Sequence, residues 1–248
     1  MLSLGILIPL WAAMVATSLL AGVFGMAGGM ILIGILLVLL PLPEAMALHA
    51  VTQIASNGWR ALFGLREVRW RIVGAYAVGL VVAMAGWSAV LFVPEKPLAL
   101  IALGLSPFVL MVLPARLQPD PERPLHAAGF GVACMSLMLL TGVPGPLLDR
   151  FFLGGRLDRL SIVATKAMCQ VLGHTLKLVY FGAVVTAAGT LDPVAATGAV
   201  IASMLGTLAA RPLLAALTDT AYRRWAGRIV TALALAYIVQ GTWLLVRP

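Results

Sequence analysis

The chain has 248 residues, of which 62% are hydrophobic and 10% are charged, and its formal net charge is +8. A soluble domain is about 45–50% apolar and about 25% charged, so this composition, with a mean hydropathy of +1.04, excludes a soluble globular enzyme, a disordered protein and a disulfide scaffold. A membrane-spanning helix needs roughly 20 mostly apolar residues, so the sequence predicts an all-α polytopic membrane protein with about 8–10 transmembrane helices.

Apolar runs separated by charged residues, or by Pro and Gly, predict the helices. They fall at about 4–24, 28–42, 45–64, 72–93, 97–115, 126–143, 145–154, 159–185, 193–217 and 225–246. Two of them, 28–42 and 145–154, are short, and each follows a Gly/Pro break. Non-helical backbone is tolerated at membrane depth only where protein or a watery cavity satisfies it, and interrupted segments in both halves of a chain indicate a transporter's binding site. Whether these two segments span or re-enter the membrane stays open.

The order of the runs predicts two membrane repeats of about five segments each. The repeats occupy 1–113 and 125–248, and a Pro-rich, charged linker at 114–124 joins them. Aligning Thr52 with Thr165 brings the polar residues of the third segment in each half into correspondence. We therefore expect each unit to read as a long segment, a break, a short segment, a polar-striped helix and two further helices.

The loop charges indicate how the two repeats are oriented. The loop after the first polar-striped helix contains Arg66, Arg69 and Arg71, whereas the matching loop at 189–193 has no basic residue, and the relation reverses at the neighbouring links. Basic residues favour cytoplasmic loops, so matching loops lie on opposite membrane faces. We therefore expect an inverted-topology repeat, a cytoplasmic linker and both termini on the periplasmic side, an arrangement that recurs in secondary transporters.

Two of the predicted helices carry polar side chains on one face. With spacings of four, four and three, these are His49, Gln53, Asn57 and Arg60 in the first half and Lys166, Gln170, His174 and Lys177 in the second. A charge at the bilayer centre costs ~3 kcal/mol or more, so such residues usually face a cavity and are functional. Several alternatives stay open: Lys166 and Arg60 snorkel to the interface, the amides only link helices, an internal ion pair with Asp149 holds a cation, or Thr52 and Thr165 bond back to their own helices.

The glycines at the breaks also have a predicted use. The short helices that begin beside Gly25, Gly28, Gly29 and Gly145 point their N-terminal amides at the breaks. Two such N-termini, assisted by Lys166 or Lys177, would make a positive region near the membrane midplane. An anion is the natural ligand of such a region.

Other kinds of site are not expected. Cys134 and Cys169 lie inside apolar runs, and two lone thiols make neither a zinc site nor a probable disulfide, so we expect no metal and no cofactor. The basic residues lie in short loops, where the positive-inside rule places them, which argues against nucleic-acid binding. The chain has no HExxH, no paired-aspartate motif and no nucleophile–base cluster, so we expect no catalytic residue. A membrane-embedded enzyme and a channel-like anion facilitator are the alternatives to a carrier.

The Gly-rich break at 22–29 is followed by a Pro and by the stretch Ala50-Val-Thr-Gln53, and a similar order recurs in the second half. These features resemble the TauE/SafE family of sulfite exporters and anion permeases over nearly the whole chain. The resemblance implies movement of small anions, such as sulfite, sulfoacetate and related sulfonates or carboxylates, across the bacterial inner membrane. The second break, Gly142-Val-Pro-Gly-Pro146, departs from the GxGGG-type break common in the family, which affects the substrate and not the fold.

The predicted function is a secondary transporter that moves a small anion by alternating access. The residues expected to line the anion site are Gly25, Gly28, Gly29, Thr52, Gln53, Asn57, Gly145, Thr165, Lys166, Gln170 and Lys177. His174 and Asp149 are candidates for proton coupling, because a histidine side chain can titrate near neutral pH. The expected partners are the anion and membrane lipid. The sequence leaves open the identity of the anion, the direction of transport, the coupling ion and a homodimer.

Overall fold

The computed structural model describes residues 4–24, 27–111, 120–153, 157–185, 191–216 and 219–246. Within these ranges every regular element is a helix. In chain order the elements are α1 (Leu4–Phe24), α2 (Ala27–Leu39), α3 (Leu42–Phe63), η1 (Leu65–Glu67), α4 (Trp70–Val90), α5 (Lys96–Met111), α6 (Pro124–Thr141), α7 (Gly145–Leu153), α8 (Arg159–Val179), the π-helix η3 (Tyr180–Val184), α9 (Pro193–Ala216) and α10 (Asp219–Val246).

Several of these helices have the length and apolar composition of membrane spans. In the described part of the chain, five qualify: Leu4–Val23, Trp70–Val90, Pro124–Thr141, Pro193–Ala210 and Arg228–Val246. The shorter apolar helices Ala27–Leu39 and Lys96–Phe108 accompany them. The prediction of an all-α polytopic membrane protein is thereby confirmed.

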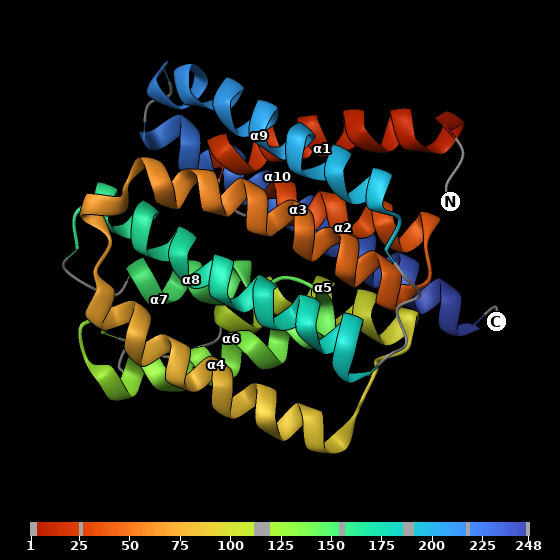
Figure 1. Ribbon diagram of the computed structural model, residues 1–248, viewed down its shortest axis with the longest axis horizontal. Helices are drawn as coiled ribbons and strands as arrows, with labels where there is room; N and C mark the ends of the chain where they lie inside the picture. Colours follow the sequence, from red (N-terminus) through yellow and green to blue (C-terminus); the bar gives the residue numbers. More distant parts are fainter. Residues whose placement is uncertain are drawn as a thin grey trace.

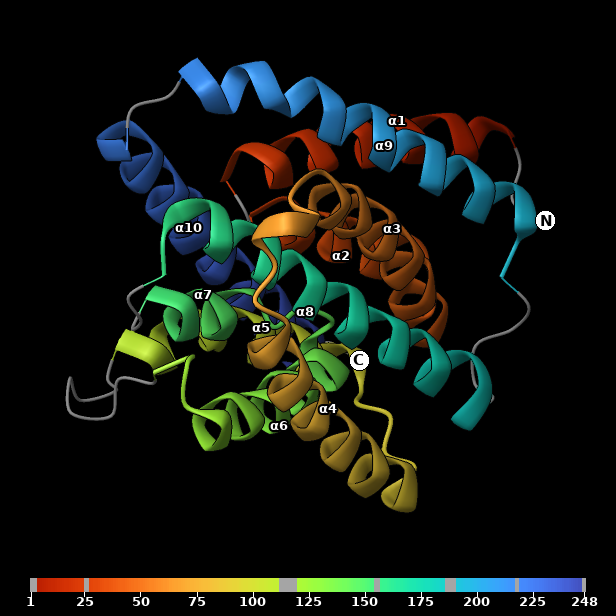
Figure 2. The ribbon, with the colours of Figure 1, turned by 60° about the vertical axis from the view of Figure 1, so that its left-hand side comes forward.

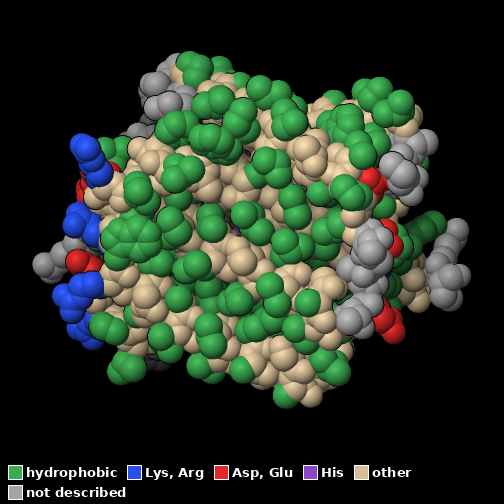
Figure 3. All heavy atoms as spheres, in the orientation of Figure 1, with side chains coloured by type: hydrophobic (Ala, Val, Ile, Leu, Met, Phe, Trp, Pro, Cys, Tyr) green, Lys and Arg blue, Asp and Glu red, His purple; other side chains and the backbone are tan. Residues whose placement is uncertain are grey.

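The two polar-striped helices, α3 and α8, lie in the middle of the molecule. They pack against each other, with α1 and α9 along one side and α4 and α6 along the opposite side (Figures 1 and 2). The outer helices α1, α4, α6 and α9 turn exposed apolar side chains outward, and Figure 3 shows apolar atoms over most of the visible face. This arrangement encloses the polar faces of α3 and α8, as a low-dielectric surrounding requires.

Helices α3 and α8 run antiparallel. Near the start of α3, His49 contacts Lys177 in the last turn of α8. At the other end, Gly64 lies so close to Ala164 that an added Cβ would be 2.8 Å from the alanine Cβ. Matching helices of the two proposed halves therefore point in opposite directions.

The helix neighbours support the inverted repeat in a second way. Helix α1 packs on α9, and α6 packs on α4. The order of segments in the sequence predicts that α1 corresponds to α6 and α4 to α9. Under this correspondence the pair α1–α9 maps onto the pair α6–α4. The repeat itself stays a prediction.

The two short helices begin inside the molecule. In the first turn of α2, Gly28 approaches α1 so closely that a Cβ would collide with the backbone of Thr17 and Ala21. Gly29 of the same turn contacts the side-chain amide of Gln53, halfway along α3. Helix α7 begins at the buried Gly145 after a turn in which Gly142 has a φ of 90°. Both helix starts thus lie next to the central pair, away from the ends of the molecule.

Candidate functional site

The polar stripes of α3 and α8 face each other across the centre of the molecule. All but the two at the arginine-rich end are buried: His49, Gln53, Asn57, Gln170, His174 and Lys177. Because the helices are antiparallel, His49 lies opposite Lys177, and its ring centroid is 5.5 Å from that of His174. The central helix pair therefore holds a compact group of polar side chains from both halves of the chain.

One hydrogen-bonded bridge connects the two broken helices through this group. His49 Nε2 lies 3.0 Å from the carbonyl oxygen of Gly29 in α2. His49 Nδ1 lies 2.8 Å from Lys177 Nζ, which in turn donates to the carbonyl oxygen of Gly142, 2.9 Å away. The bridge thus runs from the first turn of α2, through α3 and α8, to the turn that precedes α7.

The tautomer of His49 follows from these contacts. A carbonyl oxygen can only accept, so Nε2 carries the hydrogen and donates it to Gly29. Nδ1 is then a lone-pair acceptor for an N–H of Lys177. The bridge is therefore directed from Lys177 outward to both broken helices.

Lys177 lacks a compensating acid in the described part of the chain. Its side chain is 0% exposed, and its described hydrogen bonds go to two neutral acceptors, an imidazole nitrogen and a carbonyl oxygen. A buried cation without a partner charge is strongly disfavoured. The site therefore accommodates a negative charge beside Lys177 more readily than it tolerates the ammonium alone.

Three buried polar atoms of the two stripes have no hydrogen-bond partner. They are Asn57 Oδ1, Gln170 Oε1 and His174 Nδ1. Asn57 donates instead through Nδ2 to the backbone oxygen of Gln53 at 2.9 Å and to its side-chain oxygen at 3.3 Å. An unsatisfied buried polar group costs about 1–3 kcal/mol. The two amide oxygens can only accept a hydrogen bond, whereas His174 Nδ1 can donate to an anion when it carries the ring hydrogen.

Lys166 has a different environment. It forms an ion pair with Asp149 of α7, and the two side chains are 13% and 23% exposed. This is the internal ion pair that the sequence left open, with Lys166 as the cation. Lys166 was predicted to bind the anion and Asp149 to couple protons, and in this structure the two side chains form an ion pair with each other.

The two predicted threonines make structural bonds. Thr52 donates its hydroxyl to the Leu48 carbonyl in its own helix at 2.8 Å. Thr165 accepts the backbone N–H of Arg69, at the start of α4, at 3.0 Å. Arg60, at the end of the first stripe, donates to the carbonyls of Ser56 and Ala21.

The glycines of the predicted site lie at both breaks. Gly28 and Gly29 form the first turn of α2, and Gly145 begins α7. Gly25 lies outside the described residues. The first four N–H groups of a helix lack intrahelical partners, so the start of α2 presents amide donors beside Gln53. Such donors can bind an anion.

Two groups of this site are not among the lining residues predicted from the sequence. His49 belongs to the polar stripe but not to the predicted lining, and the Gly142 carbonyl belongs to neither. The signal for His49 was available, because antiparallel packing of the stripes puts an early α3 residue opposite a late α8 residue. The carbonyl gave no signal, since its position depends on the left-handed conformation of Gly142.

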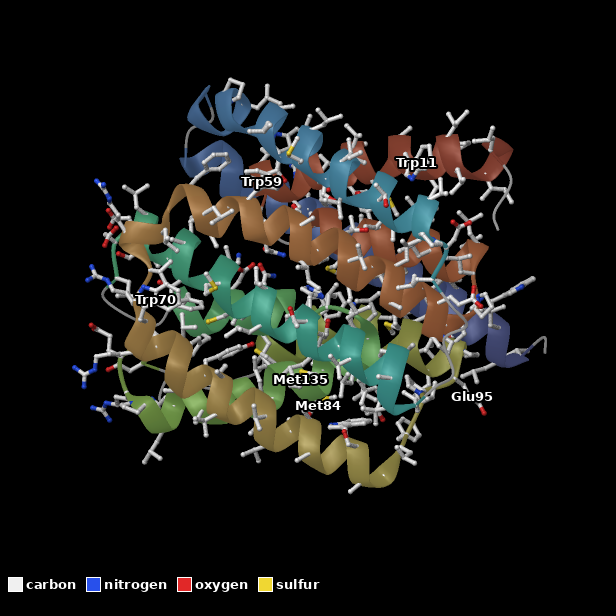
Figure 4. The ribbon with its side chains drawn as sticks, in the orientation of Figure 1. Trp11, Trp59, Trp70, Met84, Glu95 and Met135 are labelled. Atoms are coloured by element: carbon white, nitrogen blue, oxygen red, sulfur yellow. The ribbon has the colours of Figure 1, made fainter. Side chains whose placement is uncertain are left out.

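The charged residues of the described chain gather at the two ends of the molecule. Figure 3 shows basic side chains at one end and mainly acidic ones at the other. Both termini lie at the end away from the α3–α4 link with its arginines (Figure 1). Trp70 marks the basic end and Glu95 the opposite end (Figure 4).

A polytopic membrane protein with an enclosed polar centre, reached by the starts of two broken helices, has the architecture of a membrane transporter. A model of the family described as sulfite exporter TauE/SafE matches residues 10–237. The chain therefore belongs to the TauE/SafE family of membrane transporters. Neither a curated protein nor a solved structure matches the chain.

Proposed function

We propose that this protein is a secondary transporter of small anions, with sulfite, sulfoacetate and related organosulfur or carboxylate anions as substrates. The observation that supports the proposal is the buried group between α3 and α8. It contains the uncompensated Lys177 and the side-chain amides of Asn57 and Gln170, and Gln53 of the same group lies beside the amide-rich start of α2. Such a site offers a cation and neutral hydrogen-bonding groups to one small anion.

The proposed mechanism is alternating access by movement of one repeat relative to the other. The site is enclosed by protein from both halves, so an anion held there exchanges with water only if the packing of α3 on α8 changes. The His49–Lys177 bridge contacts both broken helices, and an anion that bound Lys177 would act on both at once. This geometry favours a carrier over an open pore.

The distribution of basic loops supports one orientation of the protein in the membrane. The α3–α4 link, which contains Arg66 and Arg69, lies at the end opposite both termini (Figure 1), where Figure 3 shows basic side chains. By the positive-inside rule this end faces the cytoplasm. The protein is then an inner-membrane transporter with both termini in the periplasm.

The test is flux of labelled sulfite and sulfoacetate into proteoliposomes. We expect saturable flux. We expect Gln170→Leu to raise KM roughly 10–100-fold, because the side-chain N–H of Gln170 would donate to the anion, and a hydrogen bond to a charged ligand contributes about 1.5–3 kcal/mol. The matched control is Thr175→Val, on the exposed side of the same helix, which should leave KM unchanged. Linear, gradient-independent flux would indicate a channel-like facilitator, and no flux of any tested anion would contradict the proposal.

A further inference from the structure

We propose that Lys177 is the proton site of this transporter: it takes up one proton when the anion binds and gives it back when the anion leaves. The inference rests on the proposed function and adds the coupling ion and the atom that carries it. It also moves proton coupling from His174 and Asp149, the sequence-based candidates, to the bridge between His49 and Lys177.

Two hydrogen-bond acceptors contact Nζ of Lys177. A neutral amine has two N–H groups, and the two acceptors in contact with Nζ, His49 Nδ1 and the Gly142 oxygen, use both of them. An ammonium has three donors, so protonation creates a third N–H that neither acceptor can satisfy. The structure thus fits a neutral amine without rearrangement. When the amine is protonated, its third N–H is left to donate to a ligand.

In the described part of the chain, no acidic side chain forms an ion pair with Lys177. Asp149, the acidic residue that could have compensated Lys177, is paired with Lys166. An ammonium at the fully buried Nζ would have two neutral acceptors but no described counter-charge, at a cost of several kcal/mol. A bound anion removes that cost, since an opposite charge at close range favours the charged form of the amine. Anion and proton therefore stabilise each other at the same atom.

The surrounding titratable groups leave this role to Lys177. From α3, His49 faces Lys177 with Nδ1 as an acceptor, and the ring centroid of His174, on α8, lies 5.5 Å from that of His49. None of these groups is an acid. The other titratable groups on described elements packed against α8 have no described hydrogen bond or ion pair with Lys177: Glu44, Arg60, Arg66, Glu67, Arg71, Tyr76, His126, Cys134, Asp149 and Tyr180.

One proton enters the site from the same aqueous side that supplies the anion. The proton adds to the Nζ lone pair, no covalent bond other than this N–H forms, and the reverse transfer on the far side releases both species. The electrical charge of the occupied site is lower in magnitude than that of the anion alone. This allows the pair to cross the low-dielectric centre at a lower cost than the bare anion.

The experiment measures protons bound per anion in detergent-solubilised full-length protein. Sulfoacetate is the probe, because its sulfonate and carboxylate are both ionised at neutral pH, so any proton taken up goes to the protein. A weakly buffered solution with a pH indicator should show uptake of about one proton per bound sulfoacetate in the wild type, since the anion favours the charged amine.

The decisive variant is Lys177→Arg, because a guanidinium stays charged at all accessible pH values. It should bind sulfoacetate with no measurable proton uptake. In proteoliposomes it should exchange labelled for unlabelled sulfoacetate but lose accumulation driven by a pH gradient. Lys177→Met should lose both activities, and Lys96→Arg, at the first residue of α5, is the matched control that should retain both.

His49→Phe tests the proposal independently if Lys177→Arg does not fold. Without the Nδ1 acceptor the ammonium loses a hydrogen bond, so sulfoacetate binding should move to lower pH. Wild-type binding with no proton uptake, or pH-driven accumulation retained in Lys177→Arg, would overturn the proton site alone. Absence of saturable flux of both sulfite and sulfoacetate in the wild type would overturn the proposed function, and the proton site with it.

Discussion

Gly142 connects a backbone conformation to the candidate site. Its φ of 90° lies in the left-handed region that side chains disfavour. In this conformation it ends α6 and directs its carbonyl oxygen to Lys177. Any residue with a Cβ at this position would also press on Ile33 and Met46, at 2.9 and 3.0 Å.

Replacing Gly142 by Ala should therefore lower both stability and transport. Strain at a positive φ costs about 1–3 kcal/mol, and a shifted carbonyl would remove one of the two acceptors of Lys177. Thermal unfolding in detergent and sulfite flux measure the two effects. Gly129→Ala, in the same helix α6, is the control, because an added Cβ there meets nothing within 4 Å and should not destabilise the protein. Equal unfolding temperatures for the two variants would contradict the strain.

Residue types and spacing in the sequence were enough to identify the stripe but not the partner of each lysine. Lys166 and Lys177 share one helix face, yet the first meets Asp149 and the second meets His49. Spacing along α8 fixes only which way each side chain points. The partners come from α7 and α3, and their positions depend on how these helices pack, which a single sequence does not contain.

Among the helices, α8 shows how a polar helix is started at the membrane surface. Asp158 is its N-cap and accepts the backbone N–H of Ser161 at 3.0 Å. Asp158 also pairs with Arg69 at 3.6 Å, which connects the start of α8 to the start of α4. Hydrogen bonds from Ser161 hold the pKa of this exposed carboxyl below its ordinary value.

Asp158→Ala should therefore destabilise α8 in a pH-dependent way. Because the folded-state pKa is lowered, the carboxylate stabilises the protein above its unfolded-state pKa, near 4, and that contribution disappears as the pH falls through the folded-state value. The wild type should thus unfold at a higher temperature than the variant at neutral pH, and the gap should be smaller in acid, where the protonated carboxyl keeps only a neutral capping oxygen. Asp158→Asn keeps such an oxygen and should recover part of the difference at neutral pH, whereas a gap that does not shrink in acid would contradict the assignment.

Helix positions could be predicted from hydropathy, but helix ends could not be placed as well. Helix α2 ends at Leu39, and the backbone then turns into α3, which begins at Leu42. The predicted apolar run continues to residue 42 because Leu40, Pro41 and Leu42 are also apolar. The run at 159–185 became α8 followed by a π-helix at Tyr180–Val184. Hydropathy reports where a chain is apolar and does not distinguish a bend or a change of helix type within an apolar run.

For the molecule as a whole, the loop charges carried more information than the repeat alignment. Basic residues in the α3–α4 link predicted one face, and the termini lie at the opposite end (Figure 1). The pairing of α1 with α9 and of α4 with α6 was not predicted. Apolar helix surfaces match one another too generally for a single sequence to select their neighbours, whereas a charged loop has only two membrane faces from which to choose.

The proposed orientation can be tested with single added cysteines. Arg66 and Glu95 are exposed, in the links before and after α4, and Figure 4 shows Glu95 at the end opposite Trp70, the first residue of α4. The native Cys134 and Cys169 are each 0% exposed, so the unmodified protein should give little background labelling. With a membrane-impermeant maleimide, Glu95→Cys should react in intact spheroplasts, and Arg66→Cys only after the membrane is opened, because basic loops stay in the cytoplasm. The reverse result would place the termini in the cytoplasm, and labelling of both variants from outside would show that the two links do not lie on opposite faces.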